Sequence, residues 1–509
     1  MNVMRRVVVP FLALLFAALP VAADLQSVEV GGEIRIRMRA NLNYQTTAGD
    51  PLRIPYSNSA LRGRPLGAAG VGSRFLFDDS GIDRYYVEHQ TRLNVKANFT
   101  EAVSTFVEFD SSMNWGTAFR SDFVTGLDRP SDDGISLLQS YIEVNDMFGQ
   151  PLRLRLGRQT MNLGKGWLVG DRITGLLAFS YDAARLTYNE NDLTVDAWWS
   201  KLSETAAGDE DVDFYGVYGT YTGWENNNLS LYWMFVRDGS SPEETSLSPA
   251  GEWLEDALGV DGYGSTTLHT IGARYWGEWG AFDYDWELAW QFGDASRQGA
   301  GFVPVGGGYG DDSAKFDNIG TDLELGYTFD VRWSPRVYVG GAWYQGQDNR
   351  DVSLLESLNP YRQGEASISF NRLFSDAAAK YFLILDGFQT MSNFQAIRLG
   401  VDLKPIEKLT VNLEVEQFWA DEPFDRPIFP VLPLGFLTRE SDRDIGLQFL
   451  LIARYNITPD LWFRIWIEHF LPGDGVTDGN FTDRNGLQFL QGASDDYANY
   501  LEATIGIRF

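Results

Sequence analysis

The sequence predicts an all-β fold: a transmembrane, antiparallel, up-and-down β-barrel of about 18 strands, with short periplasmic turns and long extracellular loops. Segments of about ten residues that alternate apolar and polar side chains recur from Val28 to Phe509. Short and long connections separate these segments in turn. No later segment is apolar enough to cross a bilayer as a helix, and a closed barrel is the other arrangement that satisfies the backbone hydrogen bonds in lipid.

The first alternating segment, 28–42, separates its side chains most clearly. Its even-numbered positions are apolar from Val28 to Leu42 except at Gly32. Its odd-numbered positions include Glu29, Glu33, Arg35, Arg37, Arg39 and Asn41. Side chains alternate across a strand with a period of two, whereas helical spacing would spread the arginines around a cylinder. The segment is therefore extended, with one face toward lipid and the other toward water.

Later segments alternate in the same way, among them 87–99, 282–292, 409–416 and 501–509. A soluble β-sandwich also alternates, but it turns its apolar parity toward a common core and does not place charges on its inner face. The C-terminal aromatic residue, Phe509, is typical of bacterial outer-membrane proteins. We expect the barrel assembly machinery to recognise it.

The connections give the orientation of the barrel. Short ones fall near 98–102, 146–151, 189–192, 223–228, 277–280, 330–335, 404–408 and 456–460, and they carry the Gly, Pro, Asn and Asp of turns. Longer ones include 45–84, 238–266, 293–317, 346–392, 421–443 and 472–496. Outer-membrane barrels place their short turns in the periplasm. Barrels of about sixteen to eighteen strands leave an aqueous channel, so the fold predicts a pore.

Residues 1–23 are predicted to be a signal peptide, and 24–509 a single barrel domain. Arg5 and Arg6 precede an apolar run, and small residues end the segment at Val21-Ala22-Ala23. Because the chain has no cysteine, disulfides, cysteine-ligated metals and lipoprotein anchoring are excluded. The formal charge of −29 becomes −31 without the two arginines, which argues against nucleic-acid binding.

Basic residues concentrate on the parity predicted to face the barrel interior, the lumen. They are Arg35, Arg37, Arg39, Arg92, Lys96, Arg153, Arg155, Arg185, Arg274, Arg398, Arg454, Arg464 and Arg508. Barrel closure would join the last, first and second strands into one positive wall. Acidic residues would face this wall: Asp283, Asp285, Glu287, Asp322, Glu324, Glu414 and Glu416.

Two interpretations of the lumen arginines remain open. Cross-strand pairs with carboxylates would make the wall rigid. Unpaired arginines would instead line a path for carboxylate groups, because guanidinium offers two parallel donors and keeps its charge. Conduction requires weak and repeated binding, so a ladder of such sites suits transport better than one deep pocket.

The segment 139–199 resembles the alginate export family of outer-membrane proteins. It contains Gln-Ser-Tyr-Ile-Glu-Val from 139, Leu-Arg-Leu-Gly-Arg-Gln from 154, Gly-Asp-Arg from 170 and Tyr-Asp-Ala-Ala-Arg-Leu from 181. The resemblance implies an arginine-lined barrel that passes an anionic polyuronate from periplasm to exterior. By matching motif it implies path roles for Arg155, Arg158, Asp182 and Arg185.

These observations predict a passive outer-membrane channel for an anionic polysaccharide, with alginate-type export as the reference. A general or anion-preferring porin for small solutes, a barrel enzyme and a plugged structural barrel are the alternatives. We expect no enzymatic activity and no cofactor. Expected partners are outer-membrane lipid, lipopolysaccharide and periplasmic export proteins. The three histidines fall on the lipid-facing parity, and the spacing of Asp474, Asp478, Asn480 and Asp483 departs from the EF-hand calcium loop.

Overall fold

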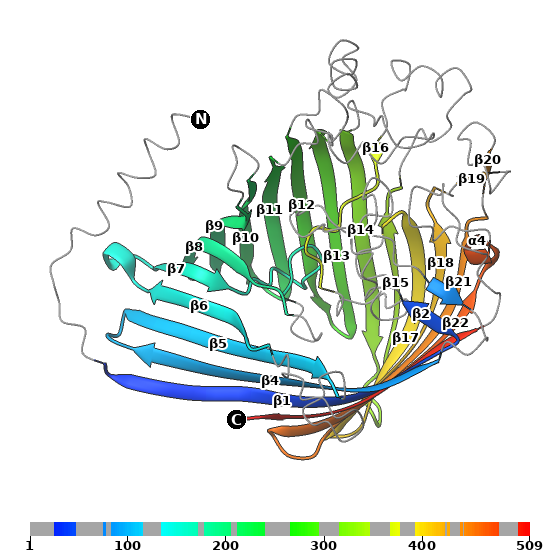
Figure 1. The fold of residues 1–509 in the computed structure, drawn as a ribbon, viewed down its shortest axis with the longest axis horizontal. Helices are drawn as coiled ribbons and strands as arrows, with labels where there is room; N and C mark the ends of the chain where they lie inside the picture. Colours follow the sequence, from blue (N-terminus) through cyan, green and yellow to red (C-terminus); the bar gives the residue numbers. More distant parts are fainter. Residues whose placement is uncertain are drawn as a thin grey trace, which may run out of the picture.

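Eighteen strands close into one antiparallel barrel, which confirms the predicted fold class (Figure 1). The structure, a computed structural model, describes residues 25–46, 75–77, 83–115, 134–171, 178–204, 211–239, 265–294, 315–346, 367–376, 392–422, 425–427, 438–440, 442–477 and 497–509. Strand β1 (Ser27–Leu42) pairs with β23 (Ala498–Arg508) on one side and with β4 (Arg84–Asn98) on the other. The first and last strands are therefore neighbours, and the sheet has no edge.

The remaining barrel strands pair with their neighbours in chain order. They are β5 (Val103–Asn114), β6 (Ser136–Val144), β7 (Leu152–Gln159), β8 (Tyr181–Glu190), β9 (Leu193–Ser203), β10 (Val212–Trp224), β11 (Asn227–Asp238), β12 (Thr266–Trp279), β13 (Phe282–Asp294), β14 (Lys315–Thr328), β15 (Arg336–Tyr344), β17 (Phe394–Ile406), β18 (Leu409–Ala420), β21 (Asp444–Asn456) and β22 (Leu461–Pro472). Short turns join them at the end expected to face the periplasm.

Smaller elements accompany the barrel. The pairs β2 (Tyr44–Thr46) with β3 (Phe75–Phe77) and β19 (Asp425–Pro427) with β20 (Thr438–Glu440) form two separate two-stranded sheets. Strand β16 (Ser367–Ile368) pairs in parallel with β14. A 3₁₀ turn, η2 (Met147–Gly149), lies between β6 and β7, and α4 (Asp474–Thr477) follows β22. Among the described residues no helix is long and apolar enough to cross a bilayer.

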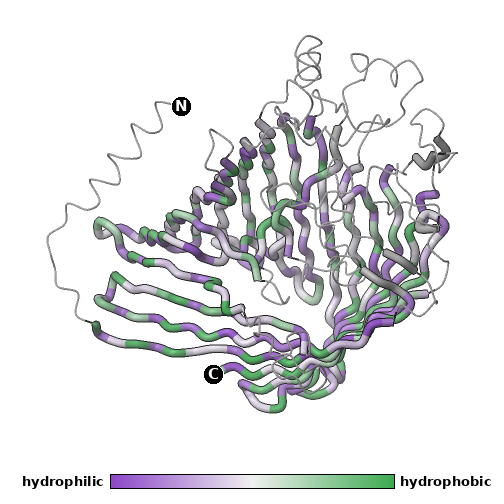
Figure 2. Tube along the Cα trace, viewed as in Figure 1, coloured by the Kyte–Doolittle hydropathy of each residue, from purple (hydrophilic) through white to green (hydrophobic). Residues whose placement is uncertain are grey.

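Burial follows the predicted parity along β1. The side chain of Met38 is 58% exposed on the outer face, whereas its neighbour Arg37 is 2% exposed on the inner face. Hydrophobic and hydrophilic residues alternate along the strands in Figure 2. Apolar side chains thus face the lipid and charged ones face the lumen, as the period of two requires.

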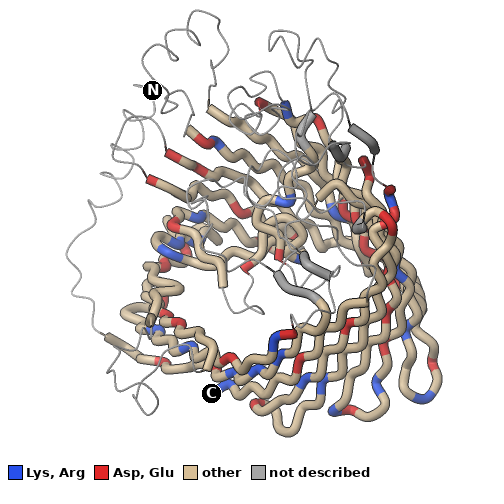
Figure 3. Tube along the Cα trace, turned by 45° about the vertical axis from the view of Figure 1, so that its right-hand side comes forward, with Lys and Arg blue, Asp and Glu red and all other residues tan. Residues whose placement is uncertain are grey.

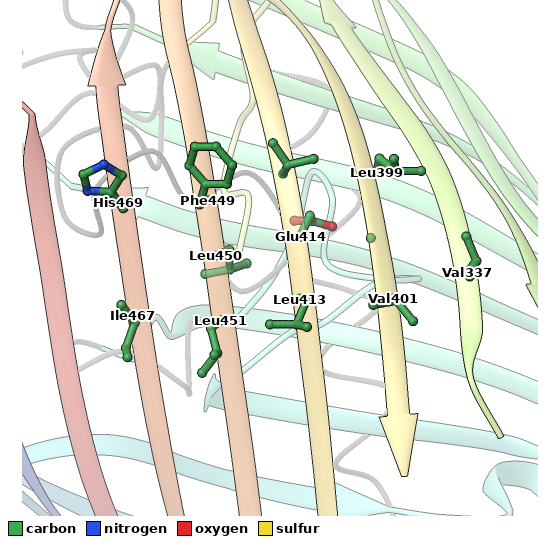
Figure 4. A pocket seen from close by; sticks show the side chains of 12 residues that line it. Val337, Leu399, Val401, Leu413, Glu414, Phe449, Leu450, Leu451, Ile467 and His469 are labelled. Atoms are coloured by element: carbon green, nitrogen blue, oxygen red, sulfur yellow. The ribbon is translucent and has the colours of Figure 1, made fainter. Parts of the chain in front are cut away.

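The outer face carries an apolar depression over β15, β17, β18, β21 and β22 (Figure 4). His469 lies at its edge and hydrogen-bonds Asn499. His269 stacks between the rings of Phe235 and Phe292, and His89 accepts a hydrogen bond from the indole of Trp115. All three histidines therefore lie on the outward parity, as predicted, among aromatic and polar neighbours that suit a membrane interface.

Two segments between strands enter the barrel and pack together inside it. Residues 160–171 follow β7, and residues 367–376 lie between β15 and β17. The backbones of Val169 and Phe374 form a parallel bridge, and the indole Nε1 of Trp167 donates to Tyr344 Oη at 2.6 Å. These contacts fix both segments against the barrel wall.

The inward segments complete an apolar core within the lumen. It contains Trp167, Leu168, Val169, Phe370 and Phe374 from these segments. The wall adds Phe214, Val236, Leu268, Phe316, Tyr344, Phe394, Phe418 and Phe470, all near the loop ends of their strands. The outer half of the lumen is therefore partly filled next to β10–β18.

A glycine makes this packing possible at β14. A Cβ atom on Gly320 would lie 2.6 Å from the ring of Phe370, which is closer than real Cβ atoms approach. The missing side chain lets the inward segment lie directly on the strand.

Candidate functional site: the charged lumen

The strands of the predicted positive wall, β23, β1 and β4, lie side by side, and β22 adjoins them (Figure 3). Arg35, Arg37 and Arg39 occupy alternate positions of β1 and all are buried on its inner face. Arg92 of β4 is buried beside them, and Arg464 of β22 lies on the same inner face. Cross-strand neighbours on one face lie about 5 Å apart, so these side chains form a continuous surface.

Glutamates are interleaved with the arginines of this wall. Arg39 Nε lies 3.3 Å from Glu88 Oε2 and 3.5 Å from Glu502 Oε2. Arg37 lies 3.8 Å and 3.7 Å from the same two carboxylates. Arg464 Nη2 approaches Glu502 Oε1 at 2.6 Å. The two glutamates therefore join β4, β1, β23 and β22 into one ionic network.

Glu33 forms a second centre nearer the turn end. Its carboxylate accepts a hydrogen bond from Arg92 and lies 3.3 Å from Arg35 Nη2 and 3.2 Å from Arg508 Nε. Across these strands arginines outnumber the glutamates that contact them, so the wall keeps a positive excess. The buried arginines of β1 are therefore paired with glutamates, as the first of the two interpretations expects. The wall nevertheless contains more arginines than glutamates that contact them.

The opposite wall is acidic, as predicted. Arg398 of β17, only 1% exposed, lies 2.9 Å from Glu324 and 3.3 Å from Asp322. Arg274 binds Asp285 through two hydrogen bonds of 3.0 and 2.7 Å. Because Arg398 and Arg274 are enclosed by carboxylates, we assign them to the structure of this wall.

An inward segment supplies a cation to the acidic wall. Lys165 Nζ lies 2.6 Å from Asp322 Oδ1 and 3.4 Å from Asp285 Oδ1. Sequence reasoning missed this role, because Lys165 lies in a connection with no strand parity. It ties residues 160–171 to β13 and β14, on the side of the lumen away from the arginine ladder.

Besides Lys404 at the turn end of β17, four cations on the lumen parity of the described strands have no carboxylate oxygen of those strands within 4.0 Å: Arg84, Lys96, Arg153 and Arg454. Arg153 donates to Thr187 Oγ1 at 3.4 Å, and Arg454 donates to Asn456 Oδ1 at 3.3 Å. Arg84 lies at the loop end of β4, whereas the other three lie close to the short turns. Cations available to a ligand therefore concentrate at the periplasmic mouth.

A second group of predicted lumen arginines lies on β7 and β8. Arg155 lies 2.7 Å from Glu143 and stacks over the Tyr141 ring, with its guanidinium carbon 4.2 Å from the ring centroid. Arg185 lies 2.9 Å from Asp196. These two arginines and Arg153 face the lumen beside β6.

Arg158 and Asp182 lie on the other face. They share the outward parity with Leu156 and Leu186, and their side chains are 43% and 52% exposed. Two hydrogen bonds of 2.7 and 2.8 Å join them to each other. The predicted path therefore has to be corrected at these two positions: strand parity turns them toward the outside of the barrel, so we leave them out of the path.

No metal site was found in the part of the chain that the structure describes, where no three acidic or histidine side chains are grouped to hold an ion. Asp474 begins α4. The other residues considered for calcium, Asp478, Asn480 and Asp483, lie outside the described residues, as does the segment 1–23.

Comparison with known proteins identifies the family to which this chain belongs. The family model for alginate export matches residues 73–487. The chain belongs to the alginate export family. The motifs at 139–199 therefore indicated the family correctly, and the match extends over most of the barrel.

Solved structures of outer-membrane proteins share the fold. OpdL of Pseudomonas aeruginosa has a TM-score of 0.51 at 10% identity, covering 95% of this chain and 99% of that chain. OccK8 (OprE) of Pseudomonas aeruginosa has a TM-score of 0.50 at 12% identity, covering 96% of this chain and 99% of that chain. No curated protein sequence matches this chain. At these identities the likeness shows the outer-membrane barrel fold alone.

Proposed function

We propose that this member of the alginate export family is a passive channel that exports an acidic polysaccharide, alginate or a related polyuronate, along an arginine-lined lumen. The family and the barrel already indicate an outer-membrane channel. The observation that carries the finer proposal is the charge of the wall. Arginines exceed their glutamate partners on β22, β23, β1 and β4, and at the mouth expected to face the periplasm Lys96, Arg153 and Arg454 have no carboxylate partner among the described residues.

The arrangement fits a polymer of carboxylates. A solute would first meet cations that lack a carboxylate partner among the described residues, and then a wall whose excess charge is spread over several strands. Each contact is weak because the buried arginines already share glutamates, and weak repeated contacts allow movement. The proposed path comprises Arg35, Arg37, Arg39, Arg92, Lys96, Arg153, Arg155, Arg185, Arg454, Arg464 and Arg508.

Single-channel recording in planar bilayers tests this function. We expect anion preference and interruption of the current by alginate oligomers, but not by neutral dextran oligomers of equal length. Steady conductance with both polymers would contradict polysaccharide export.

A porin for small anions is the competing function. The inward segments favour it, because residues 160–171 and 367–376 occupy part of the lumen beside β10–β18. In this case chloride and small carboxylates would pass with anion preference, while oligomers of either kind would leave the current unchanged.

Further expectations from the sequence stay predictions. They are removal of residues 1–23 on export, recognition of Phe509 by the barrel assembly machinery, contact with lipopolysaccharide, and cooperation with periplasmic export proteins. In the barrel Phe509 extends the pairing of β23 with β1, through backbone hydrogen bonds of 2.9 and 3.2 Å with Gly32.

A further inference from the structure

Four lumen-facing side chains form a row across β4, β5, β6 and β7. Lys96 is paired in register with Phe106, and Phe106 with Tyr141. Arg155 completes the row, because its guanidinium group covers the Tyr141 ring at 4.2 Å. Adjacent strands lie about 4.8 Å apart, so the row spans roughly 14 Å along the wall.

Phe106 is unusual for its position. The other lumen-facing side chains of β5 nearby are polar: Ser104, Glu108 and Asp110. Phe106 is only partly buried, and it does not belong to the apolar core of the inward segments. Apolar surface in contact with water is unfavourable, so an aromatic ring in this wall calls for an occupant that covers it.

The two aromatic rings stack on each other. Their centroids are 5.3 Å apart and their planes differ by 24°. Lys96 lies at one end, with no carboxylate oxygen of the described residues within 4.0 Å. Arg155 lies at the other end, over the Tyr141 ring, with Arg153 two residues before it on the same face of β7. The stacked rings are thus bounded by cations at both ends.

We propose that this row is the entry subsite of the channel, at which the Phe106 ring, with the Tyr141 ring stacked on it, packs against a pyranose ring while Lys96 and Arg153 bind carboxylate groups of the polymer. The proposal rests on the proposed export function and names what is recognised: acidic sugar residues of the polymer. A small inorganic anion would use the cations but not the rings. A neutral glycan would use the rings but not the cations.

The position of the row agrees with entry from the periplasm. Phe106 is the fourth residue of β5 and Tyr141 the fourth from the end of β6, both close to the short turns. We therefore expect the polymer to bind more readily from this side of the membrane than from the loop side.

Substitution of Phe106 tests the contribution of the aromatic ring separately from that of the charges. Alginate oligomers of defined length are added to the turn side of single channels, and the apparent dissociation constant is taken from the rates of current block. We expect Phe106→Thr to weaken block about tenfold, because it removes the stacking surface but no charge. Phe106→Tyr is the matched control and should retain block.

The outcomes distinguish the two proposals. Block weakened equally by Phe106→Thr and Phe106→Leu, with reversal potential unchanged, supports stacking by an aromatic ring. If Phe106→Thr leaves block unchanged while Lys96→Gln/Arg153→Gln abolishes it, the proposed role of the aromatic ring is wrong. The polymer would then be recognised by the cations alone. Wild-type channels that no alginate oligomer blocks would contradict the export function itself. Proper insertion of the Phe106 variants is confirmed by their wild-type conductance in salt, and folding of Lys96→Gln/Arg153→Gln by its wild-type circular dichroism spectrum.

Discussion

Replacement of Lys165 by Met would free the inward segment 160–171 from the acidic wall. Lys165 Nζ lies 2.6 Å from Asp322 Oδ1, and the two side chains are 19% and 6% exposed. Loss of one partner from a buried ion pair costs about 3–5 kcal/mol. Arg398 still lies 3.3 Å from Asp322, so we expect a smaller loss, about 2 kcal/mol, in the docking of the segment.

A loss of about 2 kcal/mol changes the ratio of docked to undocked segment roughly 25-fold. We expect the undocking to appear as frequent transitions between conductance levels in single-channel records of Lys165→Met. Lys404→Met is the matched control, because Lys404 lies near the turn end of β17 and has no ion pair among the described residues. Records of Lys165→Met as quiet as those of the control would refute the view that this ion pair holds the segment.

Three further outcomes follow from the packing. Arg39→Gln should lower the free energy of unfolding by about 3 kcal/mol in urea titrations, because two buried glutamates lose a partner; a change under about 0.5 kcal/mol would contradict the ionic network. Gly320→Val should displace Phe370 and raise single-channel conductance, whereas unchanged conductance would show that the inward segment does not narrow the pore. Arg158→Ala should leave ion selectivity unchanged and cost less than about 1 kcal/mol, since its pair with Asp182 is exposed on the outer face; altered selectivity would return it to the path.

The barrel was predictable from the sequence because strand parity has a period of two and needs no long-range information. The alternation in 28–42 placed Arg35, Arg37 and Arg39 on one face, and chain order alone made β23 and β4 the neighbours of β1. The positive and acidic walls followed from these two facts.

The pairing of each arginine was not predictable, because it depends on the register between strands. Glu88 and Glu502 reach Arg39 from two different strands, a contact that composition does not reveal. Arg158 was placed on the path by motif similarity, although its own parity differs from that of Arg155. Parity was the better guide.

The inward segments were missed for a different reason. Lumen walls of outer-membrane channels are polar, so apolar side chains on the lumen parity were an available signal. Phe214, Leu268 and Phe316 carry this signal near the loop ends of β10, β12 and β14. They indicate that something apolar packs inside, but not which connection supplies it.

The reversal potential in a salt gradient tests the central claim most directly, namely that the cations at the mouth that lack a carboxylate partner among the described residues give the lumen its preference for anions. The wild-type channel should be anion selective. The triple variant Lys96→Gln/Arg153→Gln/Arg454→Gln should shift the reversal potential toward cation selectivity without loss of stability, since these side chains form no ion pairs among the described residues. A wild-type channel that prefers cations, or a triple variant with an unchanged potential, would contradict the account.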